Sequence, residues 1–259
     1  MIRIQAHRGA SRHYPENTIP AYEGAIRENY QIIELDPKFT KDDCPVLLHD
    51  YTVNRTGRRK NGEKLPDNTK IGDLTLAEAR EIDFGIYFAP EFAGITLPTF
   101  AEILDFAKEH RFPIKVDNVL EDYDIPHQEI MFRMVRDAAA DEYVGFTCRT
   151  IEFAHRVSAF FPNSEMHYDG PVSREILEKL KSGLHNNRLS IWLPAQKKSW
   201  LPYPPADEAT VAMCREYGEV GLWTATDEEN LRHILSLKPD AVEIDGIVTP
   251  EMVNGGKNK

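Results

Sequence analysis

Short apolar runs alternate with longer runs of helical periodicity along most of the chain. The first apolar run, "IRIQA", precedes the helical pattern of "TIPAYEGAIRENY", and a later run, "EVGLWTA", precedes "DEENLRHILSL". The other strand-like runs are "QIIELD", "CPVLLHD", "FPIKVDN", "YVGFTC", "SEMHYDG", "RLSIWLP" and "DAVEIDGIV". The alternation predicts repeated strand–helix units, in which helices cover a sheet of parallel strands.

The number of units favours one architecture. If "QIIELD" and "CPVLLHD" are neighbouring parts of one layer, the sequence holds about eight strand–helix units, which is typical of a (β/α)8 TIM barrel. A doubly wound open sheet is the main alternative. No G-x-G-x-x-G or G-x-x-x-x-G-K motif follows the first strand, which weakens the nucleotide-binding form of that alternative. We therefore expect an α/β fold with a single TIM-barrel domain over residues 1–259.

One segment interrupts the alternation. Residues 51–97 are too long for an ordinary loop between a strand and a helix. The segment begins with polar residues, "NRTGRRKNGEKLPDNTKIGD", and ends with an aromatic stretch, "FGIYFAPEFAGITLP". We expect an insertion after the second strand region, which would form a lid over the mouth of the barrel.

Composition and charge disfavour several classes of function. The net charge of -11 argues against a nucleic-acid partner, because such binding depends on Lys and Arg at the phosphates. No apolar run approaches the length of about 18 residues that a transmembrane helix needs. The three cysteines lack C-x-x-C spacing and predict free thiols rather than a zinc site. The oligomeric state stays open, as does the compartment (cytoplasmic or, if an upstream signal was removed, periplasmic or secreted).

Charged and polar side chains cluster where the predicted strands end. In a TIM barrel the reactive groups lie at the C-terminal ends of the strands, around one mouth. The clustered residues are His7, Arg8, Glu34, Asp36, His49, Asp50, Lys115, Asp117, Trp223 and Thr224. We expect their side chains to converge on a common cavity.

Glu34 and Asp36 are candidate metal ligands. Alternate residues of a strand share a face, so these two carboxylates should lie close together. Two close carboxylates repel each other unless a cation lies between them. A hard divalent ion with oxygen ligands, Ca²⁺ or Mg²⁺, would remove that repulsion.

His7 and His49 are candidates for proton transfer. One imidazole can take a proton from a nucleophile while the other donates a proton to a leaving oxygen, and the near-neutral pKa of histidine suits both tasks. Arg8 offers a forked hydrogen-bond donor that matches a phosphate. A metal ion, an arginine and a lysine around one point would compensate the charge of a phosphoryl centre.

At this point the sequence resembles the glycerophosphodiester phosphodiesterase family. The stretches "AHRGASRHYPENT" and "IELDPKFTKDDCPVLLHDYTVNRT" are similar, in order, to the HRG, PENT, E-x-D and HD signatures of that family. The resemblance fades after the first part of the chain and returns weakly at "GLWTATDEENLRHIL". It implies a TIM barrel with an insertion after the second strand region. It also implies divalent-metal-dependent hydrolysis of a small-molecule phosphodiester, as in lipid metabolism.

The resemblance also implies roles for single residues. His7 and His49 would be the general acid/base pair, and Arg8 would bind the phosphate. Glu34 and Asp36 would bind the metal ion. Trp223 would line the opposite side of the substrate pocket.

The strand "IKVDN" departs from the family pattern. The family usually has an E-x-K pair here, whereas Lys115 takes the place of the glutamate and Asp117 that of the lysine. The two residues still share a face of the strand, because they are two positions apart. We expect exchanged roles, with Asp117 as a metal ligand and Lys115 at the phosphate. The alternative is that Lys115 displaces the metal ion.

Two functions follow from these patterns. The first is hydrolysis of a phosphodiester with a small polyol head such as glycerol. The second is a barrel that binds a phosphorylated or carbohydrate ligand without turnover, or that acts on an altered substrate, and its support is the exchange at Lys115 and Asp117. The two histidines favour the enzyme, since simple binding needs no proton transfer.

Overall fold

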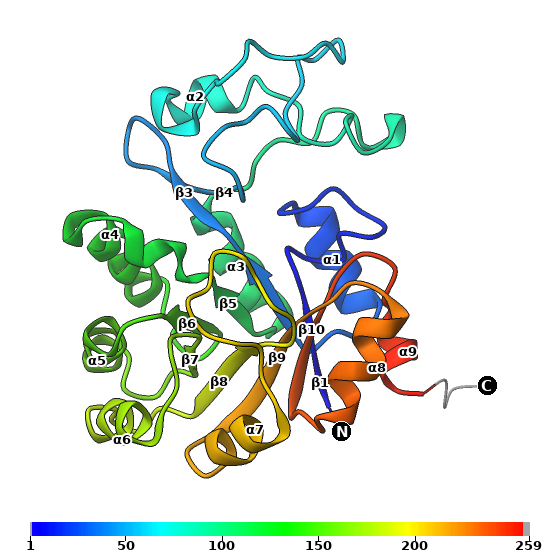
Figure 1. Ribbon diagram of the computed structural model, residues 1–259. Coiled ribbons are helices and arrows are strands. Elements are labelled where there is room, and N and C mark those ends of the chain that lie inside the picture. Colours follow the sequence, from blue (N-terminus) through cyan, green and yellow to red (C-terminus); the bar gives the residue numbers. More distant parts are fainter. Residues whose placement is uncertain (1, 256–259) are drawn as a thin grey trace.

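Eight parallel strands close into a barrel in the computed structural model, which describes residues 2–255 (Figure 1). The order around the barrel is β1-β10-β9-β8-β7-β6-β5-β2. The strands are β1 (Arg3–Ala6), β2 (Ile32–Leu35), β5 (Ile114–Val116), β6 (Val144–Cys148), β7 (Met166–Tyr168), β8 (Leu189–Pro194), β9 (Glu219–Ala225) and β10 (Ala241–Ile244). The predicted TIM barrel is confirmed.

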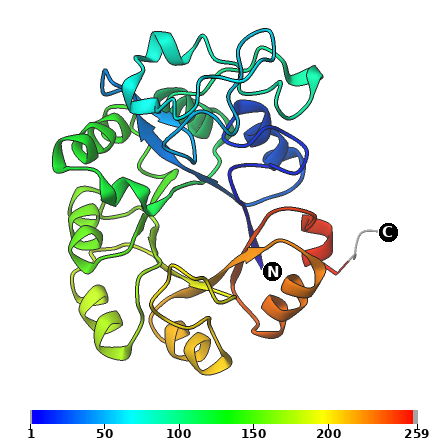
Figure 2. The ribbon, with the colours of Figure 1, turned by 45° about the horizontal axis from the view of Figure 1, so that its top comes forward.

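Helices surround the barrel (Figure 2). They are α1 (Ile19–Arg27), α3 (Phe100–His110), α4 (Ile125–Asp137), α5 (Ile151–Phe160), α6 (Arg174–Ser182), α7 (Glu208–Arg215), α8 (Glu228–Ser236) and α9 (Pro250–Val253), and the 3-10 turn η3 (Asn118–Asp122) follows β5. The short helix α2 (Leu76–Ala79) and the 3-10 turns η1 (Ile71–Asp73) and η2 (Pro90–Phe92) belong to residues 51–97, beyond the barrel (Figure 1). The longer helices begin where a Ser, Thr or Asp side chain accepts a backbone N–H, as Thr18 does at α1. Over residues 2–255, none of the helices has the length and apolar character needed to cross a membrane.

The run "CPVLLHD" is not part of the barrel. Its strand β4 (Pro45–Leu47) pairs antiparallel with β3 (Pro37–Phe39) in a separate two-stranded sheet. The expectation that β2 and β4 form neighbouring parts of one layer was therefore wrong. In the barrel, β2 pairs with β5 and not with β4. The β3–β4 hairpin therefore projects out of the barrel directly after β2.

Residues 51–97 continue outward from this hairpin and lie beyond β3 and β4 in the view of Figure 1. Residues 51–97 and the hairpin together form a small apolar cluster that is separate from the main core. The cluster contains Val46, Leu48, Val53, Ile71, Ala79, Ile82, Phe84 and Leu97. The Asp83 carboxylate ties the loop together by accepting the backbone N–H groups of Gly85 and Gly94 at 2.8 and 2.6 Å. The role of this segment as a lid stays a prediction.

A charged side chain closes the N-terminal end of the barrel. Arg3 points inward from β1 and contacts Glu165 at 2.6 Å and Glu219 at 2.7 Å, while it donates to Ser190 at 3.0 Å. The interactions connect β1 with elements on the far side of the barrel. They balance a positive charge in a region that water reaches poorly.

The middle of the barrel is filled by two rings. The indole N–H of Trp192 donates to Nδ1 of His167 at 2.9 Å. Burial lowers the pKa of His167 to about 3, so its ring is neutral and Nδ1 can accept this bond. Gly145 and Gly221 make room for the rings, because a Cβ atom at either position would collide with His167 or Trp192.

We expect Gly221→Ala to destabilise the protein by about 1–3 kcal/mol, the usual cost of overpacking a core. The added Cβ would lie 2.5 Å from the Trp192 ring. Urea unfolding measures the change. Gly72→Ala is the control, because its Cβ would have no neighbour closer than 3.8 Å. Equal stability of the two variants would contradict this account of the barrel interior.

Candidate active site

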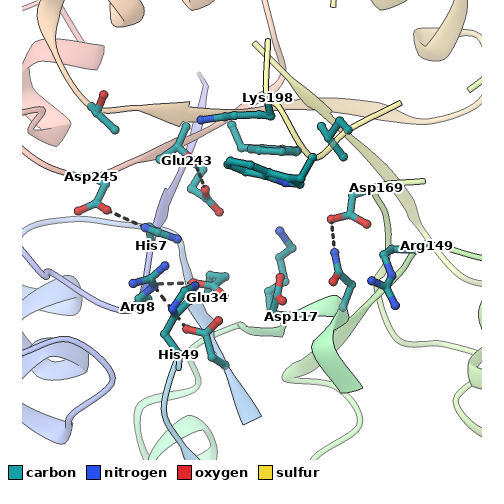
Figure 3. Close-up of a pocket in the computed structure, with 18 of the residues that line it drawn as sticks. His7, Arg8, Glu34, His49, Asp117, Arg149, Asp169, Lys198, Glu243 and Asp245 are labelled. Atoms are coloured by element: carbon teal, nitrogen blue, oxygen red, sulfur yellow. Dashed lines mark hydrogen bonds and ion pairs between the residues drawn. The ribbon is translucent and has the colours of Figure 1, made fainter. Parts of the chain in front are cut away.

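A cavity of about 780 Å³ opens where the barrel strands end (Figure 3). All eight residues that the sequence nominated for binding or catalysis line it: His7, Arg8, Glu34, Asp36, His49, Lys115, Asp117 and Trp223. They come from four barrel strands or the turns after them, and from the segment after β4. Thr224 lines the cavity as well, whereas Asp50 does not. The expected convergence is therefore present for all of the clustered residues except Asp50.

His7 is held by a carboxylate from the opposite end of the chain. Its Nδ1 lies 2.7 Å from Oδ2 of Asp245, whose other oxygen accepts from Ser11 at 2.9 Å (Figure 3). A carboxylate only accepts, so Nδ1 carries the proton and Nε2 is the atom left for chemistry. Burial alone would lower the pKa of His7, but the charge of Glu243 and the bond to Asp245 raise it to about 10.

His49 has a second carboxylate partner. Its Nδ1 lies 2.6 Å from Oδ1 of the adjacent Asp50, and Asp50 in turn accepts from Nε of Arg55 at 2.8 Å. Burial alone would raise the pKa of Asp50, but the hydrogen bonds from Arg55 and His49 lower it, so the carboxylate stays ionised. His49 is more exposed than His7, with 43% of its side chain accessible against 21%. Asp50 thus orients the ring of His49.

Glu16 connects the two histidine regions. It accepts from Arg55 at 2.6 and 2.8 Å and from Arg8 at 3.0 Å. Arg8 adopts a left-handed backbone conformation with φ of 60°, which directs its N–H to Glu34 at 2.9 Å. Gly9 follows with φ of +85°, and a Cβ there would meet Ala21 of α1 at 2.8 Å. The "HRG" and "PENT" stretches are therefore held together by the contact between Arg8 and Glu16.

Glu34, Asp36 and Asp117 bring three carboxylates to the cavity wall. Burial, and then the charge of Asp36, raise the pKa of both Glu34 and Asp117. For Asp36 the effect of burial is outweighed by the charges of Arg8 and Lys38, which lower its pKa. The three groups together therefore hold more negative charge than the neighbouring cations neutralise.

Asn17 positions Asp36. Its amide donates to Oδ2 of Asp36 at 2.8 Å, and its carbonyl oxygen accepts from the buried hydroxyl of Tyr22 at 3.0 Å. The asparagine of "PENT" thus orients a carboxylate, while the following Thr18 begins helix α1.

Lys115 lies deeper in the barrel, beside Glu34 in the register of β2 and β5. Its Nζ is 4.1 Å from the centre of the Trp192 ring, a distance typical of a cation–π contact. Within residues 2–255 it makes no hydrogen bond or ion pair. One side of the ammonium group faces the indole and the other is available to the cavity that Lys115 lines.

The carboxylates suit a hard cation by chemistry but are not gathered around one point. In the described part of the chain, no three His, Cys, Asp or Glu side chains lie close enough to hold a metal ion. The oxygen ligands of Glu34, Asp36 and Asp117, and the repulsion between these carboxylates, are typical of a divalent-cation site. Binding of one ion by Glu34, Asp36 and Asp117 together would require their side chains to move closer.

Comparison with known proteins identifies the family. The model of the "Glycerophosphoryl diester phosphodiesterase family" matches residues 7–159, more than half of the chain. This protein belongs to that family. The matched region contains both histidines, Arg8 and all three candidate carboxylate ligands.

Individual relatives are similar over shorter stretches. The glycerophosphodiester phosphodiesterase of Caldanaerobacter subterraneus is 39% identical over 114 residues, which cover 44% of this chain and 44% of that protein. The sequence match thus spans less than half of the relative's length.

Two solved structures share the fold over nearly the whole chain. A glycerophosphoryl diester phosphodiesterase from Parabacteroides distasonis has a TM-score of 0.75 at 20% identity, with 99% of this chain and 87% of that chain covered. A phosphodiesterase from Oleispira antarctica, in complex with the product sn-glycerol-3-phosphate, has a TM-score of 0.72 at 21% identity and covers 99% and 97%.

Several residues that line the cavity were not identified from the sequence alone. They are Asn118, Arg149, Asp169, Lys198, Trp200, Leu201, Tyr203, Thr226, Glu243 and Asp245. Two signals were present. Glu243 and Asp245 repeat the E-x-D spacing of Glu34 and Asp36 at the last strand, and Asp169 follows the inward-facing His167 by two positions. The loop residues Lys198, Trp200 and Tyr203 follow no strand pattern.

We expect Asp245→Asn to lower the pKa of His7 in the metal-free protein by about one to two units, since a hydrogen bond to a charged group is worth about 1.5–3 kcal/mol. Nitrogen-15 NMR of the imidazole measures the titration. Because the folded pKa of about 10 exceeds the ordinary 6.5, the associated stability is fully present below pH 6.5 and is lost as the pH rises through 10. Asp105→Asn on exposed α3 is the control, and an unchanged His7 titration in Asp245→Asn would contradict the assignment.

Proposed function

We propose that this protein hydrolyses glycerophosphodiesters by acid/base catalysis between His7 and His49. The observation that carries the proposal is the presence of two histidine–aspartate pairs in one cavity of a family member, each pair with its Nδ1 occupied. Both imidazoles would then present Nε2 for proton transfer.

The two histidines would have different tasks. His7 enters the reaction protonated, because its pKa is about 10, and donates from Nε2 to the oxygen of the departing alcohol. His49 is closer to solvent and accepts the proton of the nucleophile at Nε2. The same pair serves a water molecule or a neighbouring hydroxyl of the substrate as nucleophile. Asp245 and Asp50 keep the rings oriented, and Asp245 also stabilises the protonated form of His7.

Cationic side chains would bind the phosphate. Arg8 is braced by Glu16 and lies with Nε 3.5 Å from Asp36, so its guanidinium is held at the cavity wall. Lys115 offers an ammonium group without a hydrogen-bond partner among residues 2–255. Trp223 forms another part of the cavity lining. Arginine and lysine in a site of low dielectric stabilise the charge that develops on a phosphoryl group.

Glu34, Asp36 and Asp117 would hold a divalent cation, Ca²⁺ or Mg²⁺. When bound, such an ion supplies Lewis-acid stabilisation of phosphoryl oxygens. The exchanged pair in β5 supports this division of roles, because Asp117 lies at the level of Asp36 and shares its electrostatic field, whereas Lys115 lies one layer deeper. The ammonium group of Lys115 contacts Trp192 rather than the carboxylate cluster, which argues against Lys115 as a replacement for the ion.

A barrel that only binds a phosphorylated or carbohydrate ligand is the weaker proposal. A site that only binds a ligand would need the cationic side chains of Arg8 and Lys115. It would not need two imidazoles that are each oriented by a carboxylate.

We expect the protein to hydrolyse sn-glycero-3-phosphodiesters in the presence of Ca²⁺ or Mg²⁺. His7→Ala and His49→Ala should each lower the turnover by about two to four orders of magnitude, the usual contribution of a proton-transfer group. Steady-state kinetics with release of glycerol 3-phosphate measure the effect. His233→Ala, an exposed histidine of α8, should retain the rate of the unchanged protein. Near-normal rates in either active-site variant would remove that histidine from the mechanism, and absence of turnover with added Ca²⁺, Mg²⁺ or Mn²⁺ would favour the binding barrel.

Removal of the metal ion should abolish turnover, and Asp117→Asn should weaken metal affinity by at least about tenfold, since even the outer partners of metal ligands matter by about 10- to 100-fold. Titration calorimetry of the EDTA-treated protein with Ca²⁺ and Mg²⁺ measures the affinity. Asp50→Asn is the matched control, because Asp50 contacts His49 and Arg55 and does not line the cavity. Equal losses in the two variants would argue against Asp117 as a ligand.

A further inference from the structure

Asp169 occupies the side of the cavity that faces His7 (Figure 3). It directly follows β7 and points inward with the same alternation as His167. Its backbone is fixed on both sides, because its N–H donates to Cys148 at 3.1 Å and its carbonyl oxygen accepts from the hydroxyl of Tyr203 at 3.1 Å. The carboxylate is therefore held in place by three separate loops or strands of the barrel mouth.

The two oxygens of this carboxylate have different environments. Oδ2 accepts from the side-chain amide of Asn118 at 2.6 Å. Oδ1 is buried and has no hydrogen-bond partner within residues 2–255. A buried carboxylate oxygen without a hydrogen-bond donor is destabilising, and more so when it is charged. The proposed mechanism assigns Asp169 no proton transfer and no phosphate contact, so its position needs another explanation.

The surroundings favour a neutral donor as the missing partner. Burial and the charge of Asp117 raise the pKa of Asp169 to about 7, while the charges of Lys115 and Arg149 act in the opposite direction. A substrate ammonium group at this position would meet repulsion from Lys115 and Arg149. A hydroxyl group donates a hydrogen bond without adding charge. The cavity also contains an unpartnered donor, the indole Nε1 of Trp223, which a hydroxyl or phosphate oxygen could accept.

We propose that Asp169, oriented by Asn118, is a specificity-determining residue that accepts a hydrogen bond from a hydroxyl group of the alcohol portion of the substrate. The inference rests on the proposed phosphodiester hydrolysis and adds the selection of a hydroxyl-bearing alcohol to it. A site built around a substrate hydroxyl rejects analogues that lack it, because its buried acceptor is then left unpaired.

Three chromogenic substrates with the same leaving group isolate this contact. They are the p-nitrophenyl ester of glycerol 3-phosphate, p-nitrophenyl phosphorylcholine and bis(p-nitrophenyl) phosphate. The first carries hydroxyls, the second a cation and the third neither. Asp169→Asn should lower kcat/KM for the glyceryl ester by about 10- to 100-fold, as expected for loss of a hydrogen bond to a charged group, and should leave the other two substrates within about threefold, the usual uncertainty of single contacts.

The other outcomes overturn the proposal in different ways. Equal losses with all three substrates would show a structural role for Asp169 or a role at the metal ion. A loss confined to the choline ester would show recognition of a cation. Asp105→Asn on the outside of α3 is the matched control and should change none of the three rates.

Ligand binding keeps the test separate from catalysis. Calorimetry with sn-glycerol 3-phosphate and with inorganic phosphate should show weaker binding of glycerol 3-phosphate to Asp169→Asn and unchanged binding of phosphate. If the unchanged protein binds both but hydrolyses none of the esters, the proposed function fails while this subsite stands. Equal binding of glycerol 3-phosphate to both proteins would overturn the subsite. The Asn variant retains the shape of the side chain, and its thermal unfolding verifies the fold.

Discussion

Compensation of buried charge is the constraint on which this barrel depends. Charged side chains point inward at several levels, and each must find a partner, because an unpaired charge in a poorly hydrated interior is costly. At the N-terminal end Arg3 meets Glu165 and Glu219. In the middle Glu243 accepts from Gln5 and from Thr224. The contacts of Arg3 reach across the barrel from β1, and the bond between Gln5 and Glu243 joins β1 to its neighbour β10, so these interactions form only when the sheet is closed.

At the mouth the compensation is incomplete. Burial and the charge of Asp36 raise the pKa values of Glu34 and Asp117, although the charge of Lys115 opposes the shift of Asp117. Within residues 2–255 the ammonium group of Lys115 contacts the indole face of Trp192 and forms no ion pair. A cation near the carboxylates and an anion near Lys115 would each improve the local balance. The proposed metal ion and phosphodiester would supply both charges. Their binding would then relieve the electrostatic cost of the cavity.

Lys115 in β5 and Asp117 just after it depart from the order of acid and lysine that the resemblance to the family implies. Lys115 and Asp117 keep the spacing that places both on the inner face, but the cation now lies in the deeper layer. The deeper layer accommodates it because Trp192 presents its ring, and Trp192 itself is held by His167 and by the space above Gly221. The acid then stands at the mouth, with Asn118 and Asp169 beside it.

The sequence by itself determined the rhythm of strands and helices and the inward faces of the strands, because both follow from local periodicity. For that reason Glu34, Asp36, Lys115 and Asp117 could be assigned to one mouth in advance. Only the tertiary structure decided that β4 leaves the barrel and that His7 meets Asp245, which is 238 positions away in the chain. The position of Asp169 opposite His7 also depends on closure. Such contacts, and the pKa shifts that they cause, arise when β10 pairs with β1 and completes the barrel, and no local pattern encodes that pairing.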